Sequence, residues 1–348
     1  MSRRVLVVGA GLASAAHLTA LRRVGARVVG VVTRDPARAE AARRLAPDAQ
    51  IFATVDAAAT LAADTALIVT PPSSHLSVAD ALARRGLDLI VDKPLATTLS
   101  QAQGLIEIAE RCGVRSAITL QHRYKPAATV ARRLLVQKAI GTLRAATITV
   151  PLWRPDTYYA EPGRGTWARD GGGALITQAI HTLDVYVSLV GRPQRVTALA
   201  HTSRHRLEAE DTIHLLLDHG HHAASMTAST AAWPGSSESI HLYGDSGQLV
   251  LDGDSLTRIG SDVAQLVTGG VDGSGPDPLA MATWFTDLYT DVFDSWAAGT
   301  TPDCAADSAL AVQAVIEAAY ASARSGMTPM TVPNTERRTP ACPTRPSS

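Results

Sequence analysis

Two basic side chains in this sequence stand where proton transfer to or from a ligand would be expected. Lys93 follows the aliphatic run 87–91 in the order Val-Asp-Lys-Pro, and the carboxyl ends of buried parallel strands are where open α/β sheets hold ligands. Pro94 restricts the backbone on both sides of the Lys93–Pro94 bond. His181 lies in the apolar segment 171–189, and imidazole titrates near neutral pH. Lys93 and His181 are therefore the predicted catalytic residues.

Polar side chains accompany His181 at helical spacing. Thr177, His181 and Asp184 stand at positions i, i+4 and i+7, which share one face of an α-helix, and Gln178 lies beside them. A buried histidine held by a backbone carbonyl is the alternative interpretation of His181. We expect this helix face to line a substrate site.

The segment 153–169 concentrates aromatic and arginine side chains in a chain with only 4% aromatic residues. Aromatic faces stack on ring carbons, while guanidinium groups such as that of Arg164 bind hydroxyls or an anionic group; packing of the segment onto a helix is the alternative. Arg123, after the expected strand 114–120, either lines the same cleft or braces the domain hinge. The predicted substrate-binding residues are Lys93, Arg123, Trp153, Arg154, Tyr159, Trp167, Thr177, Gln178 and His181.

A glycine-rich turn follows the first aliphatic run of the chain. Gly9 permits the tight turn, Gly11 lets the backbone approach a pyrophosphate, and the helix expected from Leu12 and Ala13 directs its N-terminus at the phosphates. The third glycine of the GxGxxG pattern is replaced by Ser14, which is small enough for close helix–strand packing. The turn predicts a dinucleotide site.

The second expected strand ends in Thr33-Arg34 rather than in an aspartate or glutamate. A carboxylate there would bind the ribose hydroxyls of NAD and repel a 2′-phosphate, whereas a hydroxyl beside a guanidinium binds the phosphate. We therefore predict NADP, with NAD as the alternative if Arg34 is only a solvated residue at a helix start.

Alternation of apolar runs and helical patterns defines the first expected domain. The expected strands are 5–8, 28–32, 66–69, 87–91 and 114–120, and the helices between them are 12–24, a helix opened by Asp35 and Pro36, 74–85 and 100–112. This order predicts a Rossmann-type, doubly wound parallel sheet.

The pattern changes near residue 143 to half-exposed strands with hairpin-length gaps. Strands are expected from 143 and over 195–203, 211–217, 222–230, 239–243 and 248–251, with helices over 171–189, 279–298 and 305–325. The fold class is therefore α/β, with a C-terminal α+β domain built on a mostly antiparallel sheet. The expected divisions are 1–122 for cofactor binding, 123–332 for substrate binding and oligomerisation, and 333–348 as a mobile tail.

Composition excludes several function classes. The 348 residues contain 32 Lys+Arg and 32 Asp+Glu, so the net charge lacks the basic excess of nucleic-acid or membrane-surface binders. The three cysteines form no CxxC pair and no metal site is expected, which fits a reducing cytoplasm. The basic, apolar start imitates a signal peptide, but Gly9 and Gly11 interrupt it. We expect a soluble, uncleaved cytoplasmic protein.

Three segments together resemble the Gfo/Idh/MocA oxidoreductase family over the chain up to about residue 332. They are GAGLASAAH (9–17), VTPPSSH (69–75) followed by VDKP (91–94), and GGGALITQAIHTLD (171–184). The resemblance implies an NAD(P)-dependent dehydrogenase or reductase of a sugar, cyclitol or related polyol, which forms a homodimer or homotetramer through its C-terminal sheet.

The resemblance also assigns roles. Lys93 polarises the reacting oxygen, His181 relays the proton and Asp92 orients a neighbouring basic group. It completes the predicted cofactor-binding set, which is Gly9, Gly11, Leu12, Ala13, Thr33, Arg34, Thr70, Pro71, Pro72, His75, Asp92 and Lys93.

Thr177 departs from the family, which often has aspartate there. The carboxylate that would tune Lys93 and His181 is therefore missing from this position. A non-catalytic NAD(P)-binding sensor and an NAD-dependent glycosidase of the same fold are the alternative functions.

Overall fold

The computed structural model describes residues 3–260, 264–268 and 278–335, which divide into two compact units. The first unit comprises residues 3–121 and 278–310, and the second comprises residues 122–260, 264–268 and 311–335. Residues 278–310, which the sequence places in the C-terminal domain, thus belong to the first unit. Of the expected tail, 333–348, residues 336–348 lie outside the described residues.

The sheet of the first unit is parallel, with the strand order β3-β2-β1-β4-β5-β6 in the described part of the chain. Its order reverses at β1 and β4, the switch point beside which such sheets bind nucleotides. The predicted doubly wound sheet is confirmed. The sequence did not predict β3, because its three residues are too few to show a hydrophobic pattern. The strands are β1 (Arg4–Val8), β2 (Arg27–Val32), β3 (Gln50–Phe52), β4 (Thr65–Ile68), β5 (Asp88–Val91) and β6 (Ser116–Ile118).

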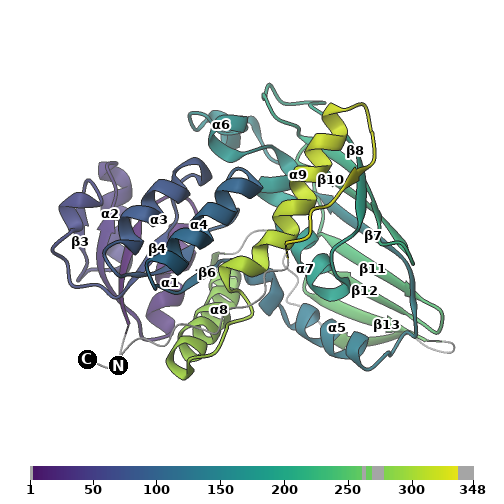
Figure 1. The fold of residues 1–348 in the computed structure, drawn as a ribbon, viewed down its shortest axis with the longest axis horizontal. Helices are drawn as coiled ribbons and strands as arrows, with labels where there is room; N and C mark the ends of the chain where they lie inside the picture. The colour runs from purple at the N-terminus through teal and green to yellow at the C-terminus, as the bar shows by residue number, and fades with distance from the viewer. Residues whose placement is uncertain (1–2, 261–263, 269–277, 336–348) are drawn as a thin grey trace. The chain divides into compact units, whose positions relative to one another are not determined.

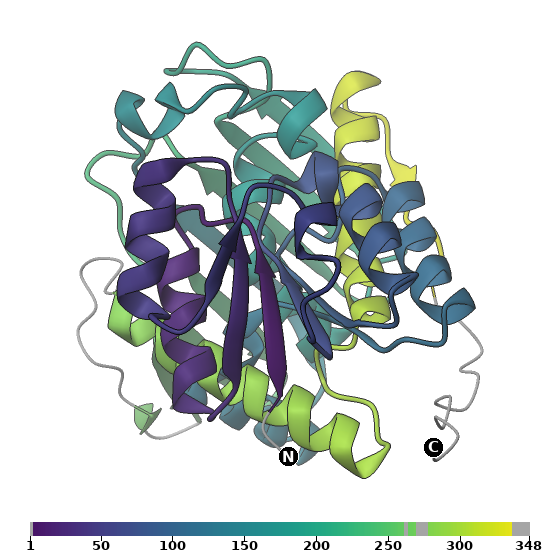
Figure 2. The same cartoon turned by 90° about the vertical axis from the view of Figure 1, so that its left-hand side faces the viewer.

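Helices cover both faces of this parallel sheet. Figure 2 shows α1 (Ser14–Arg23) and α2 (Pro36–Leu45) on one side and α3 (His75–Ala83) and α4 (Leu99–Arg111) on the other. The Asp35 carboxylate accepts from the Ala37 and Arg38 backbone N–H groups, as expected for the N-cap of α2. The later helix α8 (Pro278–Ala298) packs on α1.

The second sheet has the strand order β14-β13-β12-β11-β7-β10-β9-β8-β15 within the described residues. Its pairs are antiparallel except for β10 beside β7. Side chains of β9 and β10 alternate between buried and exposed, as expected for a sheet with one covered face. The strands are β7 (Leu143–Pro151), β8 (Arg195–His201), β9 (Thr212–Asp218), β10 (Ala223–Ser229), β11 (Ser239–Gly244), β12 (Gln248–Asp252), β13 (Ser255–Ile259), β14 (Ala264–Thr268) and β15 (Met330–Thr331).

Figure 1 shows α5 (Pro126–Val136), α7 (Ile180–Val190) and α9 (Leu310–Arg324) on the covered face of the second sheet. The sequence reading missed α5, which follows directly on a short 3-10 turn, η3 (Gln121–Tyr124). The expected helix 171–189 contains a π-helical turn, η5 (Leu175–Ala179), immediately before α7. The shorter helices are η1 (Asp56–Ala58), η2 (Pro72–Ser74), η4 (Asp156–Ala160), α6 (Trp167–Asp170) and η6 (Ala306–Ala309).

One helical stretch, Trp167–Val190, has the length and hydropathy of a membrane span. In its most apolar window, 67% of the residues are buried inside the structure. This is the environment of a core helix, which passes the same test by composition.

Candidate active site

The turn after β1 requires glycine. Gly9 has a φ of +101°, and a Cβ built there would lie 2.7 Å from the Val69 carbonyl oxygen. The end of β1 therefore lies against the backbone that leaves β4. A Cβ on Gly11 would meet nothing within 4 Å, so this backbone faces open space.

The first turn of α1 fits the pyrophosphate of a dinucleotide. Ala13 precedes the helix and supplies no side-chain cap, and Leu12 is 78% exposed beside it. Ser14 donates its hydroxyl hydrogen to the Gly11 carbonyl at 2.7 Å, which ties the turn together from inside. Uncapped backbone N–H groups at a helix N-terminus attract anions. Gly9, Gly11, Leu12 and Ala13, the residues predicted to bind the cofactor, thus form this turn and helix start.

The carboxyl end of β2 presents Thr33 and Arg34. Arg34 is exposed, and among the described side chains none pairs with its guanidinium group. The nearby carboxylate of Asp35 is engaged at the start of α2, and Thr33 Oγ1 accepts from the Asp35 backbone N–H at 3.3 Å. The end of β2 therefore presents the Arg34 guanidinium group, while the Asp35 carboxylate is engaged in capping α2.

The segment Thr70 to Pro72 leaves β4 and leads into α3. Ser74 donates to Thr70 Oγ1 at 2.7 Å. His75 is fully buried, with Nε2 at 2.8 Å from the Thr70 carbonyl oxygen and Nδ1 at 3.2 Å from that of Leu95. Burial lowers the pKa of His75 despite these carbonyl contacts. The His75 ring thus joins the loops after β4 and β5.

Asp92 forms the centre of a polar cluster at the carboxyl end of β5. Thr119 donates to its carboxylate, and the buried His17 of α1 holds Nε2 at 3.7 Å from Asp92 Oδ1 and Nδ1 at 2.6 Å from Tyr289 Oη. Burial opposes ionisation of Asp92, but His17, Lys93 and Thr119 outweigh it and hold the pKa of this carboxyl well below its usual range. Asp92 is therefore ionised, and its charge acts on the adjacent Lys93.

Lys93 itself is half-buried, directly after Asp92. The Lys93–Pro94 peptide bond is cis. Lys93, Asp92, Thr70 and Gly9 all follow carboxyl ends of neighbouring strands of one parallel sheet, so the structure gathers these predicted residues at one edge.

His181, in the second unit, lies in the first turn of α7 and is 9% exposed. Its ring stacks on that of His122, with centroids 4.4 Å apart and planes 23° from parallel. His122 Nδ1 lies 3.6 Å from Glu238 Oε1, and Lys125 donates to the same oxygen at 2.7 Å. The sequence reading singled out neither His122 nor Glu238, because their neighbours come from distant segments.

Thr177 and Asp184, which were expected to share one helix face with His181, each make a separate contact. Asp184 accepts two hydrogen bonds from Arg123, at 2.6 and 2.7 Å, in a buried ion pair. Thr177 lies in the π-helical turn and donates its hydroxyl hydrogen to the Gly173 carbonyl at 2.7 Å. These contacts give Arg123 the surroundings of a structural residue that fixes η3 to α7.

Glu210 holds the glycine segment that leads into the π-helical turn. Its buried carboxylate accepts from the Gly173 and Leu175 backbone N–H groups and from Tyr320 Oη, each at 2.9 Å. Burial raises the pKa of Glu210 even though these donors oppose it. A lone glutamate in a hairpin gives no sequence signal of this role.

The aromatic segment is tied to the π-helical turn through Gln178. Arg154 donates to Gln178 Oε1 at 2.7 Å, and Gln178 donates in turn to Tyr158 Oη at 2.9 Å. Tyr159 Oη lies 2.7 Å from Thr230 Oγ1. Arg154 and Gln178 therefore lie together, as predicted.

The two tryptophans of the aromatic segment lie in different surroundings. Trp153 packs edge-on against Trp233 with centroids 5.0 Å apart, and Trp167 packs likewise against Tyr320 at 4.8 Å. Arg164, which the sequence offered as an anion ligand, is paired with Glu161. Trp167 thus contacts the tyrosine that bonds Glu210.

Within the described residues, no group of three or more His, Cys, Asp or Glu side chains is arranged to hold a metal ion.

The parallel sheet and the glycine turn are those of a dinucleotide-binding α/β domain, and the second unit is an α+β domain built on a mostly antiparallel sheet. Residues 3–120 match the family model for the oxidoreductase family with an NAD-binding Rossmann fold, and residues 129–250 match the GFO/IDH/MocA C-terminal domain. The chain belongs to the Gfo/Idh/MocA oxidoreductase family. It is an NAD(P)-dependent dehydrogenase, which transfers a hydride between a nicotinamide and an alcohol or ketone carbon.

Individual relatives agree with this class. D-apiose dehydrogenase of Paraburkholderia graminis is 28% identical over 92% of this chain and 88% of that protein. The scyllo-inositol 2-dehydrogenase (NADP(+)) IolW of Bacillus subtilis is 25% identical over 53% of this chain and 51% of that protein. The WlbA dehydrogenase of Bordetella pertussis, solved with NADH and UDP-GlcNAcA, superposes with a TM-score of 0.84 at 25% identity, over 96% of this chain and 98% of that chain.

Proposed function

We propose that the substrate is a sugar, cyclitol or related cyclic polyol, oxidised or reduced at one secondary carbon. The observation that carries this proposal is the ionised Asp92 beside Lys93 at the carboxyl end of β5, in a fold that holds ligands at such strand ends. Relatives named for D-apiose and scyllo-inositol support the substrate class.

The chain's own residues divide the work as follows. Lys93 donates a hydrogen bond to the reacting oxygen and stabilises its negative charge. His181 takes the hydroxyl proton during oxidation and returns it during reduction. Bound nicotinamide supplies the hydride acceptor or donor. The uncapped start of α1 and the backbone at Gly11 hold the pyrophosphate.

Turnover with a panel of keto-sugars, inositols and cyclic diols, followed by nicotinamide absorbance, tests this assignment. Lys93→Gln and His181→Asn are each expected to lower kcat by about 100-fold or more, because general acid–base catalysis contributes about that much. Lys138→Gln and His201→Asn, at exposed positions, are the matched controls. Wild-type turnover in both active-site variants, with cofactor still bound, contradicts the assignment.

We propose NADP rather than NAD as the preferred cofactor. Arg34 is exposed at the end of β2, and Asp35 is engaged in capping α2, so the local charge favours a 2′-phosphate. Arg34→Ala is expected to weaken NADPH binding by about 10-fold to 100-fold and to leave NADH binding nearly unchanged. Arg27→Ala, an exposed arginine at the other end of β2, is the control. Equal loss for both cofactors, read by nicotinamide fluorescence, refutes the preference.

We also propose a homodimer or homotetramer formed through the second sheet. Leu216 is 61% exposed on β9 and points away from the face that the helices cover. Leu199 of the neighbouring β8 is exposed on the same face, and contiguous exposed apolar side chains mark association surfaces. Light scattering of the wild type and of Leu216→Asp tests this; a monomeric wild type contradicts it.

A further inference from the structure

If His181 transfers the proton, as the proposed function requires, a nearby negative charge would stabilise its protonated form. Thr177 stands where the family often has an aspartate, and its hydroxyl is bonded to the Gly173 carbonyl. The α7 helix itself carries Asp184, but this carboxylate is paired with Arg123. No carboxylate of the π-helical turn can therefore stabilise a proton on His181.

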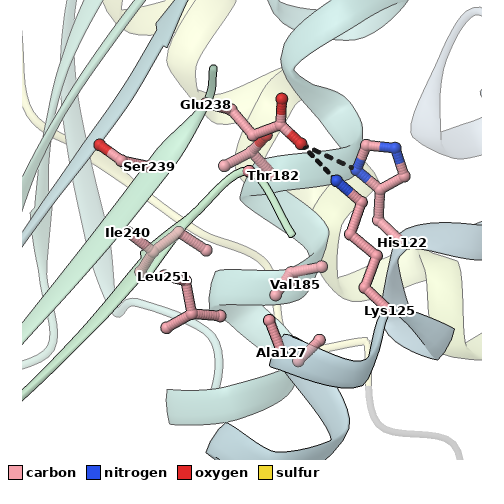
Figure 3. A pocket seen from close by; sticks show the side chains of 11 residues that line it. His122, Lys125, Ala127, Thr182, Val185, Glu238, Ser239, Ile240 and Leu251 are labelled. Carbon is pink, nitrogen blue, oxygen red and sulfur yellow. Dashed lines mark hydrogen bonds and ion pairs between the residues drawn. The ribbon is translucent and has the colours of Figure 1, made fainter. Parts of the chain in front are cut away.

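Another segment of the chain supplies a carboxylate near His181: that of Glu238, which directly precedes β11. Glu238 Oε1 lies 3.6 Å from Nδ1 of His122, and the His122 ring stacks on that of His181. Figure 3 shows the Glu238, Lys125 and His122 side chains converging, with dashed lines from Glu238 to both basic groups. His122 thus contacts both the imidazole of His181, through its ring face, and the carboxylate of Glu238, through Nδ1.

Negative groups outnumber positive ones in the ion pairs of Lys125, beside His122. Lys125 is paired with Glu238 at 2.7 Å and with Asp254 at 3.1 Å, so two carboxylates face one ammonium. The Arg123–Asp184 pair, the other charged contact on α7, is neutral as a unit. These ion pairs place two carboxylates against one ammonium, an arrangement that favours a positive charge on the stacked imidazoles.

The surroundings strengthen this attraction. His122, Lys125 and Glu238 line a small pocket that is partly open to solvent, whose remaining walls include Val185 and Leu251. Figure 3 shows these apolar side chains below the charged groups. Apolar walls reduce dielectric screening, so a charge here acts over a longer distance than at the surface.

We propose that Glu238 is a positioning residue for His181: acting through the His122 ring, its carboxylate supplies the negative charge that Thr177 does not provide. During oxidation the substrate C–H bond breaks, the hydride passes to the nicotinamide and the hydroxyl proton passes to His181. Glu238 stabilises the resulting imidazolium, and in reduction it keeps that proton available for the ketone oxygen.

The ionisation of Glu238 agrees with this arrangement. Burial opposes its ionisation, but the charge and hydrogen bond of Lys125, a backbone N–H and the charge of His181 together lower the pKa of Glu238. Glu238 is therefore a carboxylate at neutral pH.

The decisive experiment is a histidine NMR titration of the full chain, with His181 assigned from the spectrum of His181→Asn. Glu238→Gln keeps an acceptor for Lys125 but removes the charge, so the His181 titration midpoint should move to lower pH by about one unit. Lys125→Met removes the positive charge and should move the midpoint to higher pH. Glu238→Asp should restore most of the wild-type value, and the exposed Glu208→Gln is the control.

An unchanged His181 midpoint in Glu238→Gln overturns the inference, as does movement in the same direction in Glu238→Gln and Lys125→Met. If Glu238→Gln does not fold, Lys125→Met decides alone: a raised midpoint supports the inference and an unchanged midpoint overturns it. The readout needs no turnover, so it remains valid if the substrate proposal fails.

Catalysis provides the second readout. In alcohol oxidation, His181 must be neutral to accept the proton, so the acid limb of the kcat profile should move to lower pH in Glu238→Gln. Ketone reduction near neutral pH should become about 10-fold slower, because fewer molecules carry the proton. A merely structural role of Glu238 would lower kcat at every pH without moving the limb.

Discussion

Adding one methyl group at Gly173 should dislodge the segment that leads into the π-helical turn. A Cβ built on Gly173 would lie 1.7 Å from the Glu210 carbonyl oxygen, and real Cβ contacts are essentially never shorter than 3.0 Å. In Gly173→Ala the two backbones must therefore separate by more than 1 Å. The Ala174 N–H, now 2.9 Å from that oxygen, would move beyond hydrogen-bond distance.

The magnitude follows from the bonds that would be broken. A buried backbone hydrogen bond contributes about 1 kcal/mol and one to a carboxylate about 2 kcal/mol. The Gly173 N–H bond to the Glu210 carboxylate, at 2.9 Å, is the second one at risk. With the strain of an overfilled site, Gly173→Ala should lower the free energy of unfolding by about 3 to 5 kcal/mol.

Urea unfolding followed by tryptophan fluorescence measures this loss, and Gly104→Ala is the matched control. A Cβ on Gly104, inside α4, meets only Leu76 Cδ1 at 3.7 Å, an ordinary contact. That variant should gain about 1 kcal/mol because alanine favours helices over glycine. An unfolding free energy of Gly173→Ala within 1 kcal/mol of the wild type would refute the reasoning.

Three further predictions use other sites. Gly9→Ala should abolish dinucleotide binding, because its Cβ would lie 2.7 Å from the Val69 oxygen at a φ of +101°; nicotinamide fluorescence measures this, and retained binding contradicts it. Arg123→Met should lower the free energy of unfolding by about 4 kcal/mol because it removes the guanidinium partner of the buried Asp184 carboxylate, and adding Asp184→Leu should recover much of that loss; a double variant no more stable than the single one contradicts it. Burial, with the charges of two neighbouring histidines, lowers the pKa of His219 to about 4. The unfolded chain, with a histidine pKa near 6.5, therefore takes up the proton first as the pH falls. The stability that neutral His219 contributes is complete above about pH 6.5 and is lost towards pH 4, by up to about 3 kcal/mol. In urea unfolding at pH 7 and 4.5, the free energy of unfolding of His219→Gln should therefore change less with pH than that of the wild type.

The fold was predictable because its signals are local. The aliphatic runs 5–8, with Gly9 after it, and 28–32 gave β1 and β2, and the Asp35-Pro36 pair gave the start of α2. The period of two in residues 212–218 and 223–229 gave an antiparallel sheet. The elements that the sequence reading missed were short, as with β3, or lay directly against another element, as with α5.

The structure brings together only some of the residues that the sequence predicted for the site. Gly9, Asp92 and Lys93 lie at strand ends of one sheet, and topology alone brings such ends together. The expected shared face of Thr177, His181 and Asp184 assumed a regular α-helix. The π-helical turn interrupts it, and the side chains of Thr177 and Asp184 take up separate contacts.

The sequence by itself determined the family, the strand–helix alternation and the residue types able to move a proton, because motifs and periodic patterns can be read along the chain. Only the tertiary structure decided which charges face one another. Glu238 and His122 are more than 100 residues apart, yet they lie 3.6 Å from each other. Electrostatic interaction depends on distance in space and on burial, and neither can be read along a chain.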